Sequence, residues 1–329
     1  GTLNGQSFTV DRLFIDRGSS LNVGLIGYLG GGALVESITV ADADLSGDNN
    51  AGILVGRAND ADINSASSSG NISAASNIGG LVGYLSQSNI NSSYSTGDVD
   101  ASGAAGGLVG NMYLSHVHSG FSTGDVSGGD KVGGLVGTAF DDNNVSSSFS
   151  GSNVSGGNYV GGLLGENNGE VESSFSYGGV TGSSNVGGLL GYSAGGVVDG
   201  YWDTESSGQT TSDGGSGLTT SEMQGCDIEG NLQGFDFENT WSAREYDYPA
   251  LRFFVSGDIS CGVSPPSPPT LLLPIDGSNQ VPVTTNLSVT AEGTGLQNIT
   301  FYQNKSGSDS EIGSVIDVNA SNSEIARVE

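Results

Sequence analysis

The sequence predicts an all-β protein, a parallel β-helix or solenoid of about seven coils with an aromatic C-terminal cap and then a partial β-sandwich. Three observations support this prediction: a glycine-containing motif recurs seven times, 57 of the 329 residues are glycine, and short β-like runs alternate with Gly, Asn, Asp and Ser clusters. Each glycine costs a helix about 1 kcal/mol relative to alanine. Collagen is excluded because glycine does not fall at every third position and the chain has only 7 prolines.

The spacing of the motif Gly-Leu-(Val/Ile/Leu)-Gly defines one coil. Its last glycine falls at positions 27, 56, 83, 110, 137, 165 and 191, so the period is close to 27 residues. The second copy is imperfect and reads Gly52-Ile53-Leu54-Val55-Gly56. A turn of this length holds two or three strands of about 4–6 residues with their corners. Stacking successive turns buries a continuous apolar column and pairs every strand with its neighbours. We expect a right-handed coil from the handedness of parallel crossovers, and tight corners or close backbone approach at the motif glycines.

Other columns keep the same period and fill residues 1–200, the predicted solenoid. One column is aliphatic: Ile63, Ile90, Val117, Val145, Val171 and Val198. Four residues after its members lie the aromatic residues Tyr94, Phe121, Phe149, Phe175 and Trp202. Since equivalent residues of a solenoid stack, we expect these five rings to form one ladder inside the coil. A third, polar column marks a turn: Asp44, Asn71, Asp98, Asp125 and Asn153, with Gly179 in the last place.

Residues 201–262 break the period and concentrate both tryptophans with several phenylalanines and tyrosines. An open solenoid end exposes unpaired edges, so we interpret this block as a cap; the alternative is an aromatic platform for sugars. Thr219 and Glu222 have capping-box spacing, which predicts a short helix ending near Gln224. Cys226 and Cys261, the only cysteines, are expected to form a disulfide around the cap, the alternative being two buried thiols.

Residues 263–270 form a stiff proline-rich linker, and residues 271–329 alternate like the strands of an immunoglobulin-like or fibronectin type III-like sandwich. Such a domain takes about 100 residues, so we expect this segment to be only part of one. Three outcomes stay open: the native chain continues, a neighbouring chain completes the sandwich by strand pairing, or the segment is a small fold of its own.

The formal charge of −28, with only 8 Lys and Arg, limits the partners. Without a cationic patch, nucleic-acid binding is excluded. No apolar run approaches the roughly 20 residues of a transmembrane helix, so direct membrane insertion is excluded as well. An acidic, highly soluble chain suits a salty or calcium-containing medium.

The sequence offers no catalytic motif, and we expect a protein that is not an enzyme. The only histidines, His116 and His118, share one strand face, which we expect to point to solvent; the alternative is a metal ligand role.

Residues Asp42, Asp44, Ser46 and Asp48 match the first half of an EF-hand-type loop and are candidate calcium ligands. The twelfth position lacks the glutamate, and the alternative is an ordinary turn. Asp141 and Asp142 are a weaker calcium candidate, and no other cofactor is expected.

The Gly-Gly-Leu-Val-Gly blocks at 106–110 and 133–137, with Ser-Thr-Gly-Asp-Val between them, resemble the GLUG repeats of large bacterial surface and secreted proteins. The resemblance extends over roughly residues 1–255. It implies an extracellular or cell-surface adhesin-like protein whose β-solenoid is a rigid stalk or display surface, with cell-surface glycans or proteins as partners. Two alternatives stay open: a carbohydrate-binding or carbohydrate-active β-helix protein, and a filament subunit that self-associates through residues 271–329.

Overall fold

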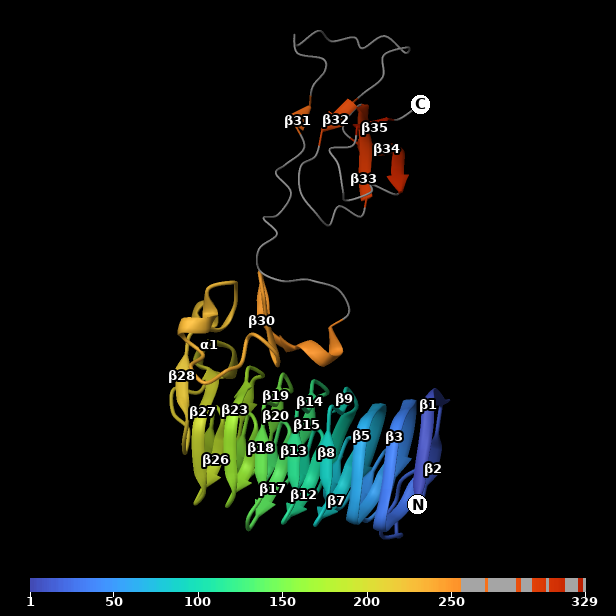
Figure 1. Cartoon of the computed structure of the whole chain (residues 1–329), viewed down its shortest axis with the longest axis vertical. Coiled ribbons are helices and arrows are strands. Elements are labelled where there is room, and N and C mark those ends of the chain that lie inside the picture. The colour runs from blue at the N-terminus through green and yellow to red at the C-terminus, as the bar shows by residue number, and fades with distance from the viewer. Residues whose placement is uncertain (256–269, 272–287, 291–297, 306–307, 317–324, 328–329) are drawn as a thin grey trace. The chain divides into compact units, whose positions relative to one another are not determined.

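A computed structural model of the chain describes residues 1–255 and, after them, strands at 270–271, 288–290, 298–305, 308–316 and 325–327. Contacts divide the chain into two units, Gly1–Asp258 and Ile259–Glu329. The first unit is a parallel β-solenoid, which confirms the predicted fold class. Figure 1 shows its coils following one another from β1 to β28.

One complete coil runs from Ser76 to Ala101 and contains five strands. They are β6 (Ser76–Gly79), β7 (Val82–Ser86), β8 (Asn89–Asn91), β9 (Tyr94–Ser95) and β10 (Asp98–Ala101). The prediction of two or three longer strands per coil is therefore wrong. Two polar residues in the left-handed region, Gln87 with φ 50° and Ser92 with φ 46°, turn the chain directly after β7 and β8 and end these two strands early.

Each strand pairs in parallel with its equivalent in the next coil. On the motif side these are β4 (Asn49–Gly52), β11 (Ala105–Gly106), β16 (Val132–Gly133), β21 (Asn158–Gly161) and β25 (Ser184–Gly187), followed by β12 (Val109–Tyr113), β17 (Val136–Phe140), β22 (Leu164–Asn167) and β26 (Leu190–Ser193). On the other sides these are β13 (His116–His118), β14 (Phe121–Ser122), β15 (Val126–Ser127), β18 (Asn144–Ser146), β19 (Phe149–Ser150), β20 (Val154–Ser155), β23 (Glu170–Ser176), β24 (Val180–Thr181), β27 (Gly196–Asp203) and β28 (Ser216–Leu218).

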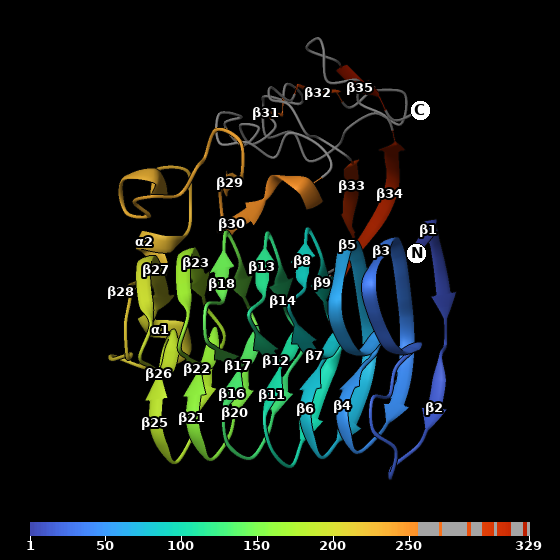
Figure 2. The ribbon, with the colours of Figure 1, turned by 60° about the horizontal axis from the view of Figure 1, so that its bottom comes forward.

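The first coils are built from longer strands. These are β1 (Thr2–Asp11), β2 (Phe14–Asp16), β3 (Ile26–Ser46) and β5 (Val55–Ala74). β1 and β2 pair in parallel with β3, and β3 pairs in parallel with β5. Figure 2 shows β1 and β2 at one end of the stack.

The aliphatic column lies in the core, with one correction. Ile63, Ile90, Val117 and Val171 are fully buried. The last member is Val197, which pairs with Val171, whereas Val198 is 50 % exposed and points outward. The coil that follows Val171 is 26 residues long, one fewer than the usual period, so an alignment at 27 residues selects the wrong side of the strand.

The aromatic residues stack as a ladder, but on the outer face of the coil. Ring centroids are 4.6 Å apart between Tyr94 and Phe121, 4.9 Å between Phe121 and Phe149, and 5.2 Å between Phe149 and Phe175. None of these four rings belongs to the core cluster. The prediction of an interior ladder is therefore wrong for them, and Trp202 is not its next member, because Phe175 pairs with Tyr201.

Serine takes the inward position next to each outer ring. The inward column is Ser68, Ser95, Ser122, Ser150 and Ser176, and Trp202 ends it. The coil is too narrow here for rings: a Cβ on Gly134 would lie 2.1 Å from the Ser150 hydroxyl. Ser122 also donates a hydrogen bond of 2.6 Å to the Gly134 carbonyl. Close approach across the coil, as expected from the sequence, is thus the role of the paired motif glycines.

The segment after β27 closes the end of the solenoid and then returns along its side. It contains α1 (Thr204–Ser207), α2 (Thr220–Met223), η1 (Ile228–Gly230), β29 (Trp241–Arg244), β30 (Asp247–Leu251) and η2 (Arg252–Phe254). Trp202 packs into the end of the core, and Trp241 and Phe254 contact the outer ladder. Figures 1 and 2 show β30 beside the middle coils. The segment predicted to cap the end of the solenoid therefore also covers part of its side.

The second unit contains five described strands. β31 (Thr270–Leu271), β32 (Ser288–Thr290) and β35 (Ile325–Arg327) form one antiparallel sheet, and β33 (Asn298–Lys305) pairs antiparallel with β34 (Ser308–Ile316). The predicted linker at 263–270 lies almost entirely outside the described residues. So do the connections between these strands, and the sandwich over 271–329 stays a prediction.

Candidate functional site

A shallow groove crosses several coils on the face that contains β10, β15, β20 and β24. Its volume is about 680 Å³. The strands here are only two to four residues long, so in each coil two side chains point outward and one aliphatic side chain points inward. Because the coils repeat, the outward side chains form two parallel rows along the groove.

The first row is the polar column predicted from the sequence. Hydrogen bonds link its members from coil to coil: Asp98 accepts from the Asp125 amide at 2.9 Å, and Asp125 accepts from the Asn153 side-chain amide at 3.0 Å. Asn153 in turn accepts from the Gly179 amide at 3.1 Å. Each side chain therefore ties its own coil to the next one while it remains at the surface.

The second row consists mainly of hydroxyl groups. Ser127 donates to Asp100 at 2.7 Å, and at the N-terminal end Ser46 donates to Asp16 at 2.8 Å. Between the rows the aliphatic residues Val99 and Val126 are buried. The groove thus presents hydrogen-bond acceptors and hydroxyls over an apolar floor. Its carboxylates accept hydrogen bonds that connect neighbouring coils.

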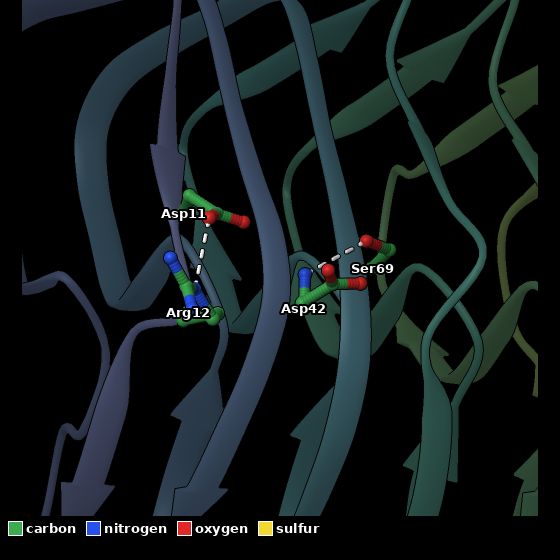
Figure 3. A network of polar contacts seen from close by, with 4 residues as sticks. All are labelled: Asp11, Arg12, Asp42 and Ser69. Atoms are coloured by element: carbon green, nitrogen blue, oxygen red, sulfur yellow. Dashed lines mark hydrogen bonds and ion pairs between the residues drawn. The ribbon is translucent and has the colours of Figure 1, made fainter.

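The candidate calcium ligands do not form a loop. Asp42, Asp44 and Ser46 lie in the single strand β3, and Asp48 follows it. At a corner with φ 50°, the Asp42 amide donates to the Ser69 hydroxyl at 3.1 Å, as Figure 3 shows beside the Asp11–Arg12 ion pair. An EF-hand-type site needs ligands that converge from a twelve-residue loop, so the predicted site is wrong in its geometry. Across the described residues, no group of three or more His, Cys, Asp or Glu could hold a metal ion.

His116 and His118 are exposed on β13 and Val117 between them is buried, which confirms the predicted orientation. His118 lies 3.0 Å from the Ser146 hydroxyl in the next coil. Each helix in the described part of the chain is a single short turn, so none of them could span a bilayer.

Of the two features predicted for the cap, the short helix is confirmed and the disulfide pairing stays a prediction. α2 runs from Thr220 to Met223 with a Thr219–Glu222 capping box, which confirms the predicted helix and its end near Gln224. Cys226 is disulfide-bonded. Cys261 lies outside the described residues, so the pairing of the two cysteines stays a prediction.

A buried carboxylate that the sequence analysis missed fastens the cap to the last coil. Asp203 is 0 % exposed and caps α1 by accepting from the amides of Glu205 at 2.8 Å and Ser206 at 3.1 Å. It also accepts from the hydroxyls of Thr220, at 2.7 Å, and Tyr248. An Asp directly before Thr-Glu-Ser-Ser is a helix N-cap signal that could have identified α1.

The hydrogen bonds to Asp203 decide the ionisation of the cluster. Burial alone raises the pKa of Asp203, but the hydrogen bonds from Thr220, Tyr248 and the two amides outweigh it and hold this pKa below its usual range. Burial, together with the bond to the Asp203 carboxylate, raises the pKa of Tyr248 to about 12. The cluster is therefore an ionised carboxylate held by neutral donors.

Two comparisons with known proteins agree with the repeat. Residues 74–100, a stretch as long as one coil, match the family described as "The GLUG motif". A stretch of 73 residues, 22 % of this chain, is 33 % identical to Halomucin from Haloquadratum walsbyi (strain DSM 16790 / HBSQ001). That match covers 1 % of the length of Halomucin. The chain therefore carries a GLUG motif and spans only a small part of the length of this relative.

Proposed function

We propose that this chain is a structural module of an extracellular or cell-surface protein, in which the solenoid is a rigid spacer whose outer faces are displayed to the surroundings. The observation that carries the proposal is the unbroken register of the motif column. The motif column pairs in parallel from Ile26 through Val55, Val82, Val109, Val136 and Leu164 to Leu190. In this role the chain does not act as an enzyme.

The register supports stiffness because each coil is hydrogen-bonded to its neighbours along several strands. In a solenoid of this kind, stability is the sum of coil stabilities and neighbour interfaces, so bending at one coil would break a whole set of ladder bonds. Side-chain ladders add to this, as Asn77 donates to Asn50 at 3.0 Å and Asn91 donates to Asn64 at 2.9 Å. A spacer of this design keeps its length under load.

The net negative charge of the chain supports a role in which its outer faces are exposed to water. The chain has 36 Asp and Glu against 8 Lys and Arg. Within the groove, Asp98, Asp100 and Asp125 keep their carboxylates at the surface while they bond to the next coil. A strongly charged face remains soluble at high salt and resists non-specific association. The GLUG motif and the partial similarity to Halomucin favour the same setting.

Hydrogen exchange on the whole chain tests the spacer. A rigid module predicts slow, continuous protection of the strand amides from β3 to β27, with no fast-exchanging coil between them. A break in protection at one coil in the middle of the stack would reject the rigid spacer. Antibodies against the solenoid test the setting: they should label intact cells of the source organism or detect the protein in the medium. Labelling only after the cells are opened would reject an extracellular role.

A further inference from the structure

The outer aromatic ladder ends abruptly at Tyr94. One face of this ring stacks on Phe121 with an angle of 4° between the planes. On its other side, the residue paired with Tyr94 in the strand register is Ser67, and Thr39 follows in the preceding coil. Two small hydroxyl residues therefore stand where the ladder would place its next rings.

The missing ring leaves a pocket against the free side of Tyr94. Its volume is about 200 Å³. Two aromatic residues of η2 bound it together with Tyr94. Phe254 lies edge-on to Tyr94, with centroids 5.3 Å apart at 83°, and Phe253 is 62 % exposed at the mouth.

Four of the residues that line the pocket carry a hydroxyl group: Thr39, Ser65, Ser67 and Ser92. Thr39 and Ser67 lie 2.9 Å apart and share one hydrogen bond. Each hydroxyl has one donor and two acceptor positions, so this pair retains capacity for a ligand after bonding to each other. The pocket thus combines an apolar ring face with several hydroxyls in a small space.

We propose that this pocket binds one pyranose ring of a glycan, stacked on Tyr94 as the next member of the ladder. A pyranose has an apolar face of C–H groups and an edge of hydroxyls, which matches an aromatic floor beside a hydroxyl rim. An aromatic side chain would match the floor alone and would leave the rim hydroxyls without partners. The site is independent of the spacer role and adds a ligand to it.

Saturation-transfer NMR on the whole chain tests the site, with methyl β-D-glucopyranoside as the probe and sorbitol, a polyol without a ring, as its control. One sugar ring is expected to bind with a dissociation constant in about the millimolar range, which this method detects. Saturation of the ring C–H protons of the glucoside, without saturation of sorbitol, supports the proposal. No saturation of the glucoside overturns it.

Three variants locate the binding. Tyr94→Ser removes the platform and should weaken binding by about tenfold, whereas Tyr94→Phe keeps the ring and should bind as the parent does. Ser67→Phe fills the pocket with a further ladder ring and should abolish binding. Ser216→Phe is the matched control, since Ser216 is an exposed strand serine at the other end of the stack, and it should change nothing.

Circular dichroism confirms that each variant is folded before it is compared. If Tyr94→Ser unfolds, Ser67→Phe still decides the outcome, because it adds a ring without removing the ladder. Binding that survives both substitutions would overturn the assignment to this pocket. p-Cresol that saturates while the glucoside does not would identify a site for aromatic side chains and would also overturn the proposal.

Discussion

Trp202 pairs with Ser176 in the strand register, so a tryptophan ends a column that serine fills in the five preceding coils. Ser176 donates to the Gly188 carbonyl of the opposite side at 2.8 Å. In the last coil the indole Nε1 of Trp202 donates instead to the Gln209 carbonyl at 3.0 Å, and the ring covers Gly188. One change of residue thus converts a repeating coil into the closed end of the core.

Trp202→Ser should therefore open that end. Restoring the repeating residue removes a buried ring from the end of the core, and we expect the free energy of unfolding to fall by about 3–5 kcal/mol. Thermal or urea unfolding measures the loss. Tyr246→Ser, at a side chain that is 78 % exposed, is the control and should change it by less than about 0.5 kcal/mol. An unchanged midpoint in Trp202→Ser would show that the ring does not close the core.

Gly133→Ala tests the close approach of the backbone in the motif. A Cβ there would lie 2.0 Å from the Val136 carbonyl oxygen and 2.6 Å from the Gly165 amide nitrogen, and neither backbone atom can move freely. We expect a loss of at least about 1–3 kcal/mol in unfolding free energy. Gly18→Ala meets no atom within 4 Å and should lie within about 0.5 kcal/mol of the parent. Equal effects of the two substitutions would contradict the steric explanation.

Phe175→Ala tests the contribution of the outer ladder to stability. Phe175 is 0 % exposed and contacts Phe149, Phe235, Trp241 and Tyr248. Removing it should cost about 3–5 kcal/mol and loosen the returning segment. Phe8→Ala, at a ring that is 73 % exposed, should have little effect. The fluorescence of Trp241 should shift towards that of exposed tryptophan only in Phe175→Ala, and no shift would show that the ladder does not hold this segment.

Alkaline pH should release the cap through Tyr248. Its pKa is raised to about 12 in the folded state, against about 10 in an unfolded chain. The resulting stability, roughly 2–3 kcal/mol, is therefore complete below pH 10 and is lost as the pH rises towards 12. Burial raises the pKa of Tyr177 and Tyr201 in the same direction. The unfolding midpoint should thus fall more steeply between pH 10 and 12 in the parent than in Tyr248→Phe. Parallel slopes would contradict this role of Tyr248.

The solenoid could be predicted because its signal repeats. Seven copies of the motif fix the coil length and the inward aliphatic column, and Val117 with its neighbours in the column lies where alternation places it. The alternation fails at Tyr94 and Ser95. A large apolar residue beside a small polar one predicts that the ring points inward, yet Ser95 lies inside because the coil narrows against Gly80. The distance between opposite sides of a coil depends on tertiary packing, so it cannot be read from one column of the sequence repeat.

The candidate sites also differ in whether neighbouring residues or residues far apart in the sequence form them. The capping box at Thr219 is local, so the sequence predicted it, and the structure confirms it. The candidate calcium loop at Asp42 is local too, but strand pairing of β3 with β5 extends those residues and overrides the loop. The cluster around Asp203 and the pocket beside Tyr94 both need residues from the returning segment. These contacts join residues that are far apart in the sequence, and such contacts leave no recognisable pattern in a single sequence.

The returning segment also sets the order in which the coils can melt. Phe254 contacts Tyr94 and Phe121, and Trp241 contacts Phe149 and Phe175, so one short stretch of chain fastens four successive coils. These four coils are not expected to unfold one at a time, because unfolding any of them breaks its ring contacts with the returning segment. Among the described residues, the coils before Tyr94 make no ring stacking of this kind with the returning segment, and their stability depends on their neighbouring coils. We therefore expect unfolding to begin at the end at β1 and to pause before the coil of Tyr94, after which the four coils that the returning segment contacts unfold together.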